Sequence, residues 1–357
     1  MSLLSLGWNA RLESVSQSFR EQGLEPMRVA REDRDRYTVL TASGALSAVL
    51  TGRFRHDART RADLPAVGDW VMARAEPGGP ATISALLPRA SAFLRKVAGD
   101  TTEEQVVAAN VEAVFLVCGL DGDFNPRRIE RALTAAWESG AQPVVVLNKA
   151  DLANDVEVRV TETEAVAPGA PVVALSALEG NGLDALSPWL RPGHTIALIG
   201  SSGAGKSTLT NALLGEARQA TGAVREEDSR GRHTTTHREL VPLPSGALLL
   251  DTPGMRELQL WGDDSGLEGA FPEVTELVAL CRFSDCTHAS EPGCAVLEAL
   301  ASGGLDPARF ATWRKLQREL RYLAGRQDAR IRAEDMAKWK LIHKEMRHHP
   351  KASRWKR

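Results

Sequence analysis

The chain has 357 residues, of which 43% are hydrophobic, and a formal net charge of −2. This length allows two or three domains with a sizeable core, and the balanced total excludes no class of partner until charge is mapped along the chain. The four cysteines are too few and too clustered for a disulfide framework, which favours a reducing compartment.

Neither a targeting signal nor a membrane-spanning segment is predicted. The opening MSLLSLGWNARLE has no basic n-region, which argues against a signal peptide. The longest apolar runs fall far short of the roughly 18 residues that a spanning helix needs. We expect a cytoplasmic protein that does not bind a membrane and, because no heptad pattern is sustained, a monomer.

The N-terminal part is predicted to form a small β-barrel. Residues 1–30 carry weak helical signals and are interpreted as an extension, whereas 31–97 contain short strands separated by Gly, Pro and Asp. Four or five such strands indicate an OB-like barrel, a fold that often binds RNA or single-stranded DNA. The arginine-rich stretch 52–65 could contact RNA phosphate or could be a solvated hairpin loop.

Residues 98–262 alternate apolar strands with helical segments. This pattern predicts a parallel α/β sheet, in which ligands bind at the carboxyl ends of the strands. Each nucleotide-binding motif described below lies at such an end.

The first motif is the tetrad NKAD, which follows the apolar run VVVL and suits guanine. The Asp151 carboxylate can accept from guanine N1–H and the exocyclic amine, and a site of this kind rejects the analogue that lacks the donors by ~10⁴ or more. Asn148 can support the loop and the base edge, and the Lys149 stem can pack over the ring. A helix N-cap is the alternative for Asp151, and backbone N–H groups after the next strand could hold the guanine carbonyl. The expected contacts are Asn148, Lys149, Ala150, Asp151, Ser176 and Ala177.

A phosphate-binding loop, GSSGAGKST, follows a later strand. Its glycines let backbone N–H groups turn onto phosphate oxygens, and the helix that begins there adds its favourable dipole. Lys206 would reach the β and γ phosphates, and the Ser207 hydroxyl would ligate Mg²⁺. The strand before and the helix after argue against a chance Gly/Ser-rich loop. The expected contacts are Gly200, Ser201, Ser202, Gly203, Ala204, Gly205, Lys206, Ser207 and Thr208.

Two later segments would act as switches. In DTPG, Asp251 would hold Mg²⁺ through water and the Gly254 N–H would sense the γ-phosphate. The segment GRHTTTHREL offers threonine hydroxyls to Mg²⁺, although it could also be an ordinary β-rich loop. The expected magnesium ligands are Ser207, Thr234, Thr235 and Asp251.

The group that orients the attacking water is not evident. Met255 stands where such a group is often found, and a thioether cannot do this work. Either intrinsic hydrolysis is slow or another group acts. His233 is a candidate because it can accept a proton near neutral pH, and a structural histidine is the competing interpretation. The expected catalytic residues are Lys206, His233 and Gly254.

These motifs stand in a rotated order, since the base reader precedes the phosphate loop and the switches. In the usual Ras-like arrangement the phosphate loop comes first, so the order indicates a circular permutation, which surface termini tolerate. The second switch then leads directly toward a cysteine-rich region. Our hypothesis is that nucleotide state changes the placement of that region.

Residues 263–357 are predicted to form a helical zinc-binding domain. The stretch CRFSDCTHASEPGC supplies Cys281, Cys286, His288 and Cys294, a closed tetrahedral set that suits structural Zn²⁺. Free buried cysteines or a redox pair are the alternatives.

The last residues, 330–357, are strongly basic, with ten Lys/Arg against three Asp/Glu. Trp339 and Trp355 lie among these charges. The pattern favours RNA backbone contact with aromatic stacking over a solvated helix.

Together these motifs resemble the ribosome small subunit-dependent GTPase A family (RsgA, also called YjeQ). The resemblance covers almost the whole chain: the barrel, the permuted NKAD, GSSGAGKST, GRHTTT and DTPG, and the cysteine–histidine spacing. It implies a GTPase that acts late in maturation of the small ribosomal subunit and is stimulated by that subunit. It also implies that the barrel and the zinc domain contact ribosomal RNA and that the four ligands hold zinc.

Three functions compete. The first is a Mg²⁺-dependent GTPase, binding GTP and GDP and gated by the small ribosomal subunit. The second is a GTP-controlled RNA-binding checkpoint or chaperone with incidental hydrolysis, which Met255 keeps open. A small-molecule P-loop kinase is disfavoured, because nothing resembles a phosphoryl-acceptor site and NKAD would have no use. We predict the first.

Overall fold

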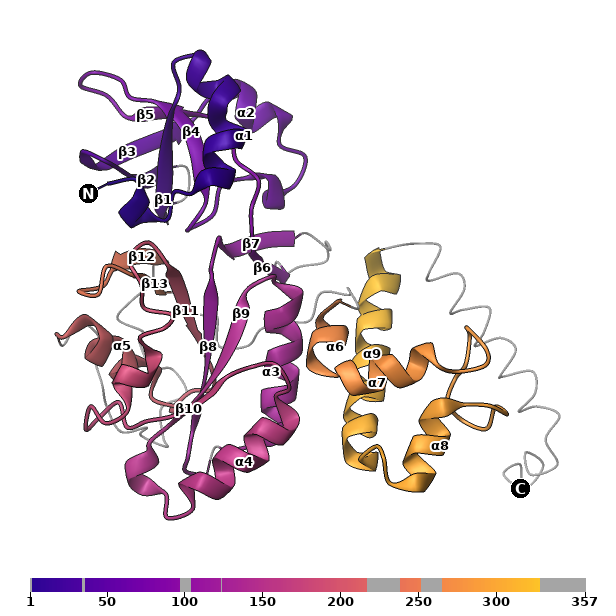
Figure 1. Ribbon diagram of the computed structural model, residues 1–357. Coiled ribbons are helices and arrows are strands. Elements are labelled where there is room, and N and C mark those ends of the chain that lie inside the picture. The colour runs from indigo at the N-terminus through magenta and orange to yellow at the C-terminus, as the bar shows by residue number, and fades with distance from the viewer. Residues whose placement is uncertain are drawn as a thin grey trace, which may run out of the picture.

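The computed structural model describes residues 2–33, 36–96, 104–122, 124–216, 238–251 and 265–327. In Figure 1 a β-barrel stands above a central α/β unit, and a helical unit lies against one side of that α/β unit. This arrangement confirms the predicted fold class. Among the described helices, none is both long enough and apolar enough to cross a membrane.

The N-terminal unit is a closed β-barrel. Its strands are β1 (Glu25–Asp33), β2 (Arg36–Thr41), β3 (Gly44–Leu50), β4 (Trp70–Arg74) and β5 (Ala81–Leu86). They follow the order β1-β2-β3-β5-β4, and the pairing of β4 with β1 closes the barrel. Alternating side chains fill the interior, among them the fully buried Met27, Val39, Val71 and Ile83.

Four helical segments accompany the barrel strands. They are η1 (Leu4–Leu6), α1 (Ala10–Glu21), α2 (Gly52–Asp57) and η2 (Arg61–Asp63). Helix α1 begins at Asn9, whose side chain accepts a hydrogen bond from the Leu12 backbone at 3.1 Å. Leu12 then packs in a cluster with Trp8 and Trp70. Residues 1–30 thus add a helix and part of a strand to the barrel unit, and the domain boundaries themselves stay a prediction.

The central unit is a mostly parallel sheet in the order β10-β9-β8-β11-β13-β12. Its strands are β8 (Ala113–Gly119), β9 (Gln142–Asn148), β10 (Val172–Ala174), β11 (Thr195–Ile199), β12 (Glu239–Pro242) and β13 (Leu248–Asp251). Only the pairing of β12 with β13 is antiparallel within this set. The sheet continues into the barrel, because Arg31 on β1 pairs with Glu239 on β12.

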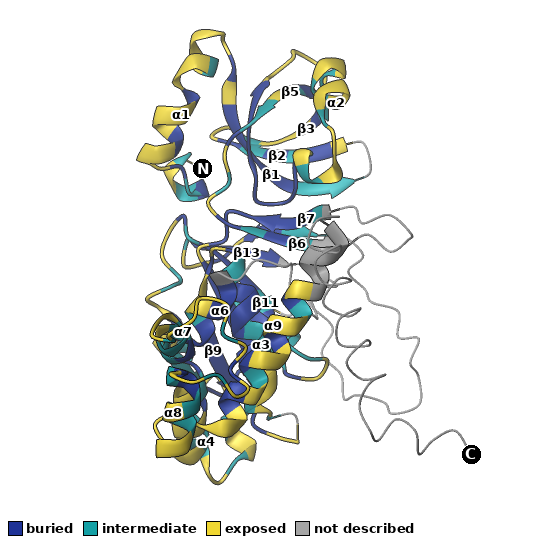
Figure 2. Ribbon diagram, turned by 90° about the vertical axis from the view of Figure 1, so that its right-hand side faces the viewer, coloured by how far each residue is buried: buried dark blue, intermediate teal, exposed yellow. Residues whose placement is uncertain are grey.

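Helices cover both faces of this sheet, which explains the continuous apolar runs of its strands. Helices α3 (Pro126–Glu138) and α4 (Val156–Val166) pack on the face that carries Val145 and Leu147, whereas α5 (Lys206–Leu214) packs on the other. Figure 2 shows β9 and β11 as buried, with exposed residues on the helices around them. The short turns are η3 (Ala150–Leu152) and η4 (Leu183–Leu186), and β6 (Ala92–Lys96) pairs with β7 (Glu104–Ala109) beside the barrel.

The C-terminal unit is helical and packs on α3. It consists of α6 (Ser265–Ala270), α7 (Pro272–Ala279), α8 (Ala295–Ser302) and α9 (Pro307–Gln327). Helix α6 approaches α3 closely at Gly266, where an added Cβ would lie 2.3 Å from the Thr134 carbonyl oxygen. On α9, the buried Arg309 donates to Glu130 of α3 at 2.9 Å and to the Ala270 carbonyl at 2.7 Å.

One buried arginine joins the barrel to the central unit. Arg28 on β1 is 1% exposed, and its guanidinium donates to the carbonyls of Gly68 at 3.3 Å and Asn110 at 3.1 Å. It also donates to the Thr195 hydroxyl at 2.7 Å and to the Leu6 carbonyl. Burial lowers the pKa of Arg28 to about 10, so the guanidinium stays charged at neutral pH. The barrel, the connecting segment and β11 therefore share one hydrogen-bonding centre.

Replacing Arg28 with methionine should lower the free energy of unfolding by about 3–5 kcal/mol, because buried carbonyls would lose their donors. Urea denaturation followed by tryptophan fluorescence measures this. Arg20→Met is the matched control: Arg20 is 39% exposed and pairs with Glu13 at 3.2 Å, so its loss should stay below about 1 kcal/mol. Equal losses for the two variants would contradict the anchoring role of Arg28.

Candidate nucleotide-binding site and metal centre

The carboxyl ends of neighbouring strands bring the predicted nucleotide-binding loops to one edge of the sheet. Strands β10, β9, β8 and β11 are adjacent in that order. Backbone bonds also join the loops that follow them: Leu120 N–H donates to the Asn148 carbonyl at 2.8 Å, and Ala150 N–H donates to the Leu175 carbonyl at 3.1 Å. The NKAD tetrad, Ser176 with Ala177, and the glycine-rich loop at 200–205 therefore lie beside one another.

Asn148 connects three of these loops through hydrogen bonds. It ends β9, is 2% exposed, and uses both ends of its side-chain amide within the protein. Its Oδ1 accepts from the Ala177 backbone N–H at 3.0 Å, and its Nδ2 donates to the Ala204 carbonyl at 3.0 Å. Because a buried amide without partners is costly, this side chain fixes the spacing between the tetrad, the Ser176–Ala177 turn and the glycine-rich loop.

The other residues of the tetrad face a more open edge. Lys149 has a left-handed backbone, with φ 64°, and its ammonium lies 2.5 Å from the Asp121 carboxylate. Ala150 and Asp151 begin the short turn η3, and Asp151 is exposed. The sequence analysis did not single out Asp121, although its place two residues after β8, the neighbour of β9, was a usable signal.

The glycine-rich loop is shaped by what packs behind it. An added Cβ at Gly200 would lie 2.1 Å from the Val117 carbonyl oxygen, and one at Gly205 would lie 2.1 Å from Asn148 Nδ2. Gly205 also has φ 93°. Only glycine fits both positions, since a side chain would push the loop away from β8 and from the Asn148 amide.

The loop ends at the N-terminus of α5, which begins with Lys206. The Lys206 ammonium donates to the carbonyls of Gly200 at 2.8 Å and Ser201 at 2.5 Å, so it lies against the loop itself. Helix N-termini of this kind bind anions through free backbone N–H groups. The remaining predicted contacts on this loop and first turn are Ser202, Gly203, Ala204, Ser207 and Thr208.

The predicted switch residues are placed only in part. The backbone of Asp251 ends β13, whose pairing with β11 brings it to the same edge of the sheet. His233, Thr234, Thr235 and Gly254 lie outside the described residues. Their catalytic and magnesium-binding roles stay predictions.

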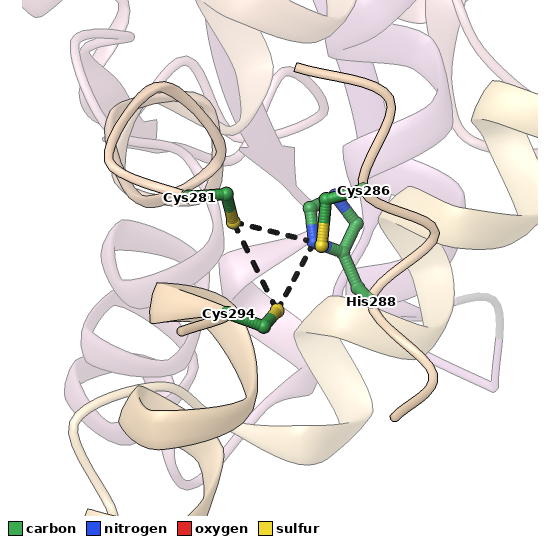
Figure 3. Close-up of side chains that lie close together, drawn as sticks. All are labelled: Cys281, Cys286, His288 and Cys294. Atoms are coloured by element: carbon green, nitrogen blue, oxygen red, sulfur yellow. Dashed lines mark hydrogen bonds between the residues drawn. The ribbon is translucent and has the colours of Figure 1, made fainter. Parts of the chain in front are cut away.

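A second site lies in the helical unit, where three cysteines and one histidine converge (Figure 3). Cys281 follows α7, Cys294 caps α8, and Cys286 and His288 lie in the loop between these helices. The Cys281 and Cys294 sulfurs are 3.8 Å apart, and His288 Nδ1 lies 3.6 Å and 3.4 Å from them. A tetrahedral zinc ion with Zn–S bonds of about 2.3 Å separates sulfurs by about 3.8 Å. These three ligand atoms therefore have the spacing of a tetrahedral zinc site, and all four, with Cys286, lie within 4.8 Å of one another.

The surroundings of the cluster hold its ligands in place. The buried His288 ring packs edge-on against Phe310 and Trp313 of α9. The Glu291 carboxylate accepts hydrogen bonds from the ligand loop, first from the Thr287 hydroxyl and then from backbone N–H groups, and these bonds hold the pKa of Glu291 well below its usual range. The backbone donors are Thr287, Ala289 and Ser290. Such supporting contacts are typical of structural metal sites.

Comparisons with known proteins point to one family. The model of the family described as RsgA GTPase matches residues 86–261. The small ribosomal subunit biogenesis GTPase RsgA of Opitutus terrae is 52% identical, over 97% of this chain and 97% of its own. The small ribosomal subunit biogenesis GTPase RsgA 1 of Oceanobacillus iheyensis is 47% identical, over 88% of this chain and 90% of its own.

Solved structures of similar fold agree with these sequence comparisons. YjeQ from Thermotoga maritima has a TM-score of 0.64 and 28% identity, covering 83% of this chain and 98% of its own. YloQ, a circularly permuted GTPase, has a TM-score of 0.62 and 24% identity, covering 83% of this chain and 95% of its own. The likeness to YloQ supports the fold alone.

Alanine at Gly205 should destabilise the protein more than alanine at Gly215. Both glycines are left-handed, with φ 93° and 71°, but an added Cβ at Gly215 meets nothing within 4 Å. The shared backbone strain should cost about 1 kcal/mol. Displacing the Asn148 amide should add about 1–3 kcal/mol for Gly205→Ala only. Urea denaturation of both variants gives the difference, and equal losses would show that Asn148 can move aside freely.

Proposed function

The chain belongs to the RsgA GTPase family, and we propose that it hydrolyses GTP to GDP and phosphate during late maturation of the small ribosomal subunit, with stimulation by that subunit. The observation that supports the proposal is that the NKAD tetrad and the glycine-rich loop at 200–205 meet at one sheet edge, where the Asn148 side chain joins them. The names of the Opitutus terrae and Oceanobacillus iheyensis relatives support the choice of the small subunit.

Recognition of GTP would begin at the base. The exposed Asp151 carboxylate would accept the two guanine donors. In this structure the Ser176 N–H donates to the Asn181 carbonyl at 2.9 Å and the Ala177 N–H donates to Asn148 Oδ1 at 3.0 Å, so the predicted contact with the guanine carbonyl requires one of these N–H groups to change partner. Adenine would leave the carboxylate without its donors, so the site discriminates by hydrogen bonding rather than by shape. Asn148 contributes through the loops that it positions.

Phosphate chemistry would take place at the N-terminus of α5. Lys206 leaves its contacts with the Gly200 and Ser201 carbonyls and binds the β and γ phosphates, where it stabilises charge in the transition state. Ser207, Thr234 or Thr235, and Asp251 would hold Mg²⁺, which neutralises charge on the phosphates. Gly254 senses the γ-phosphate and His233 orients the attacking water in this scheme. Because Met255 cannot orient water, fast hydrolysis would require the protein to be docked on the subunit.

Contacts with ribosomal RNA are proposed for the barrel, the helical unit and the basic tail. In the barrel, Arg53, Arg55, Arg59 and Arg61 are all exposed. They lie on and after α2 rather than along a strand, so several can reach a phosphate backbone together. The tail 330–357 lies outside the described residues. We propose further that the protein works as a monomer in the cytoplasm.

Hydrolysis of GTP should rise by at least about tenfold, or 1.4 kcal/mol in barrier height, when small subunits are added to the purified protein. Large subunits should have no effect, and Lys206→Ala should abolish turnover because phosphate charge is no longer stabilised. Phosphate release measured with each subunit tests this. Intact GTP-dependent binding to small subunits without stimulation would instead favour a binding switch with incidental hydrolysis.

One Zn²⁺ per chain is proposed for the Cys281–Cys294 cluster, and elemental analysis of the purified protein should find one equivalent. Cys294→Ala should remove the metal and lower the free energy of unfolding by about 4 kcal/mol or more, because loss of a structural metal is among the largest single-residue effects. Cys118→Ala is the matched control, since Cys118 is a buried thiol in β8 outside the cluster. Full zinc content in Cys294→Ala would exclude the assignment.

A further inference from the structure

The loop that follows β8 places a carboxylate beside the base-reading tetrad. Strands β8 and β9 run parallel in register, so that Gly119 pairs with Asn148. Asp121 lies two residues after Gly119, and Lys149 lies one residue after Asn148. The two side chains therefore emerge side by side at the carboxyl edge of the sheet, where the nucleotide base is proposed to bind.

The carboxylate and the lysine form an ion pair. Lys149 Nζ lies 2.5 Å from Asp121 Oδ2, and the two side chains are 27% and 33% exposed. The space for this pair depends on Gly119, where an added Cβ would lie 2.8 Å from Asp121 Oδ1. Asp121 is thus turned back over the end of its own strand and toward Lys149.

Lys149 also lies near the glycine-rich loop and has a strained backbone. An added Cβ at Gly205 would lie 4.0 Å from Lys149 Cε, so the lysine stem lies beside the glycine-rich loop. The Lys149 backbone is left-handed, with φ 64°. A lysine rarely adopts this conformation, and such backbone strain is found mainly at functional sites where surrounding contacts hold it.

We propose that Asp121 is a positioning residue for guanine nucleotides: its carboxylate holds the Lys149 ammonium so that the aliphatic stem is fixed where it covers the face of the bound base. This inference rests on the proposed function, because it assigns the stem to the guanine site. A free lysine side chain loses much rotamer freedom when it is ordered. The ion pair removes this freedom before the nucleotide arrives, which raises affinity.

The test uses the full-length protein and GDP titrated by calorimetry. Asp121→Asn keeps the size of the side chain but removes its charge, and should weaken GDP binding about fivefold. In steady-state hydrolysis of GTP, the variant should change KM more than kcat. Asp155→Asn is the matched control. Asp155 lines the same pocket of about 470 Å³ as Asp121 but pairs with Arg159 at 3.0 Å, so its variant should bind GDP as the wild type does.

A double-mutant cycle with Lys149→Ala separates positioning from a general structural effect. Once the lysine is gone, Asp121→Asn should change GDP affinity by less than about twofold, because the two residues act as a unit. The difference between wild type and Asp121→Asn should also shrink in high salt, which screens a partly exposed ion pair.

The outcomes are distinct. Wild-type affinity in Asp121→Asn, or a loss that adds in full to that of Lys149→Ala, would overturn the role of Asp121 and leave the proposed function intact. A wild-type protein that binds GDP no better than ADP would instead overturn the guanine site itself.

Discussion

The hydrogen bonds of the buried Asn148 amide are the interaction on which the proposed nucleotide site depends. It donates to the phosphate loop at Ala204 and accepts from the turn at Ala177, while its own backbone ends β9. The site is therefore defined by contacts between strand ends and not by the order of motifs along the chain. Strand β11, which carries the phosphate loop, lies between β8 and β13 in the sheet although β8, β9 and β10 all precede it in sequence. This explains how a rotated motif order is compatible with one compact site.

Buried charged groups fix the outer units on the central sheet in a similar way. Arg28 holds the barrel against Thr195 at the start of β11, and Arg309 holds the helical unit against Glu130 on α3. A buried charge that loses its partner is strongly destabilising, so both joints resist opening. If nucleotide state moves the helical unit, as we hypothesise, the movement must overcome the buried contacts of Arg309. Such a movement would have to break the Arg309–Glu130 pair or carry α3 with it.

The sequence predicted the fold class and located the principal motifs because their signals are local. Apolar runs identify buried strands, and the spacing of Gly, Lys and Ser in the phosphate loop is compact. Strand β1 was not identified from the sequence, because Arg28 interrupts its apolar pattern and its partners come from residues as distant as Thr195. Asp121 and Arg309 were not identified from the sequence for the same reason, because each pairs with a residue on another element. Pairings of this kind depend on the topology of the fold, and no local pattern in a single sequence indicates them.

Backbone strain marks the places where side-chain chemistry matters most. Within the described residues, the non-glycine positions with positive φ are Asn110, Lys149 and His288. Asn110 accepts from Arg28 between the barrel and the central unit, Lys149 lies in the NKAD tetrad, and His288 lies in the cysteine–histidine cluster. Each left-handed residue costs about 1 kcal/mol, which glycine would avoid. Glycine would also remove the amide, the ammonium or the imidazole, so the strain at these positions is the consequence of needing a particular functional group where the chain turns.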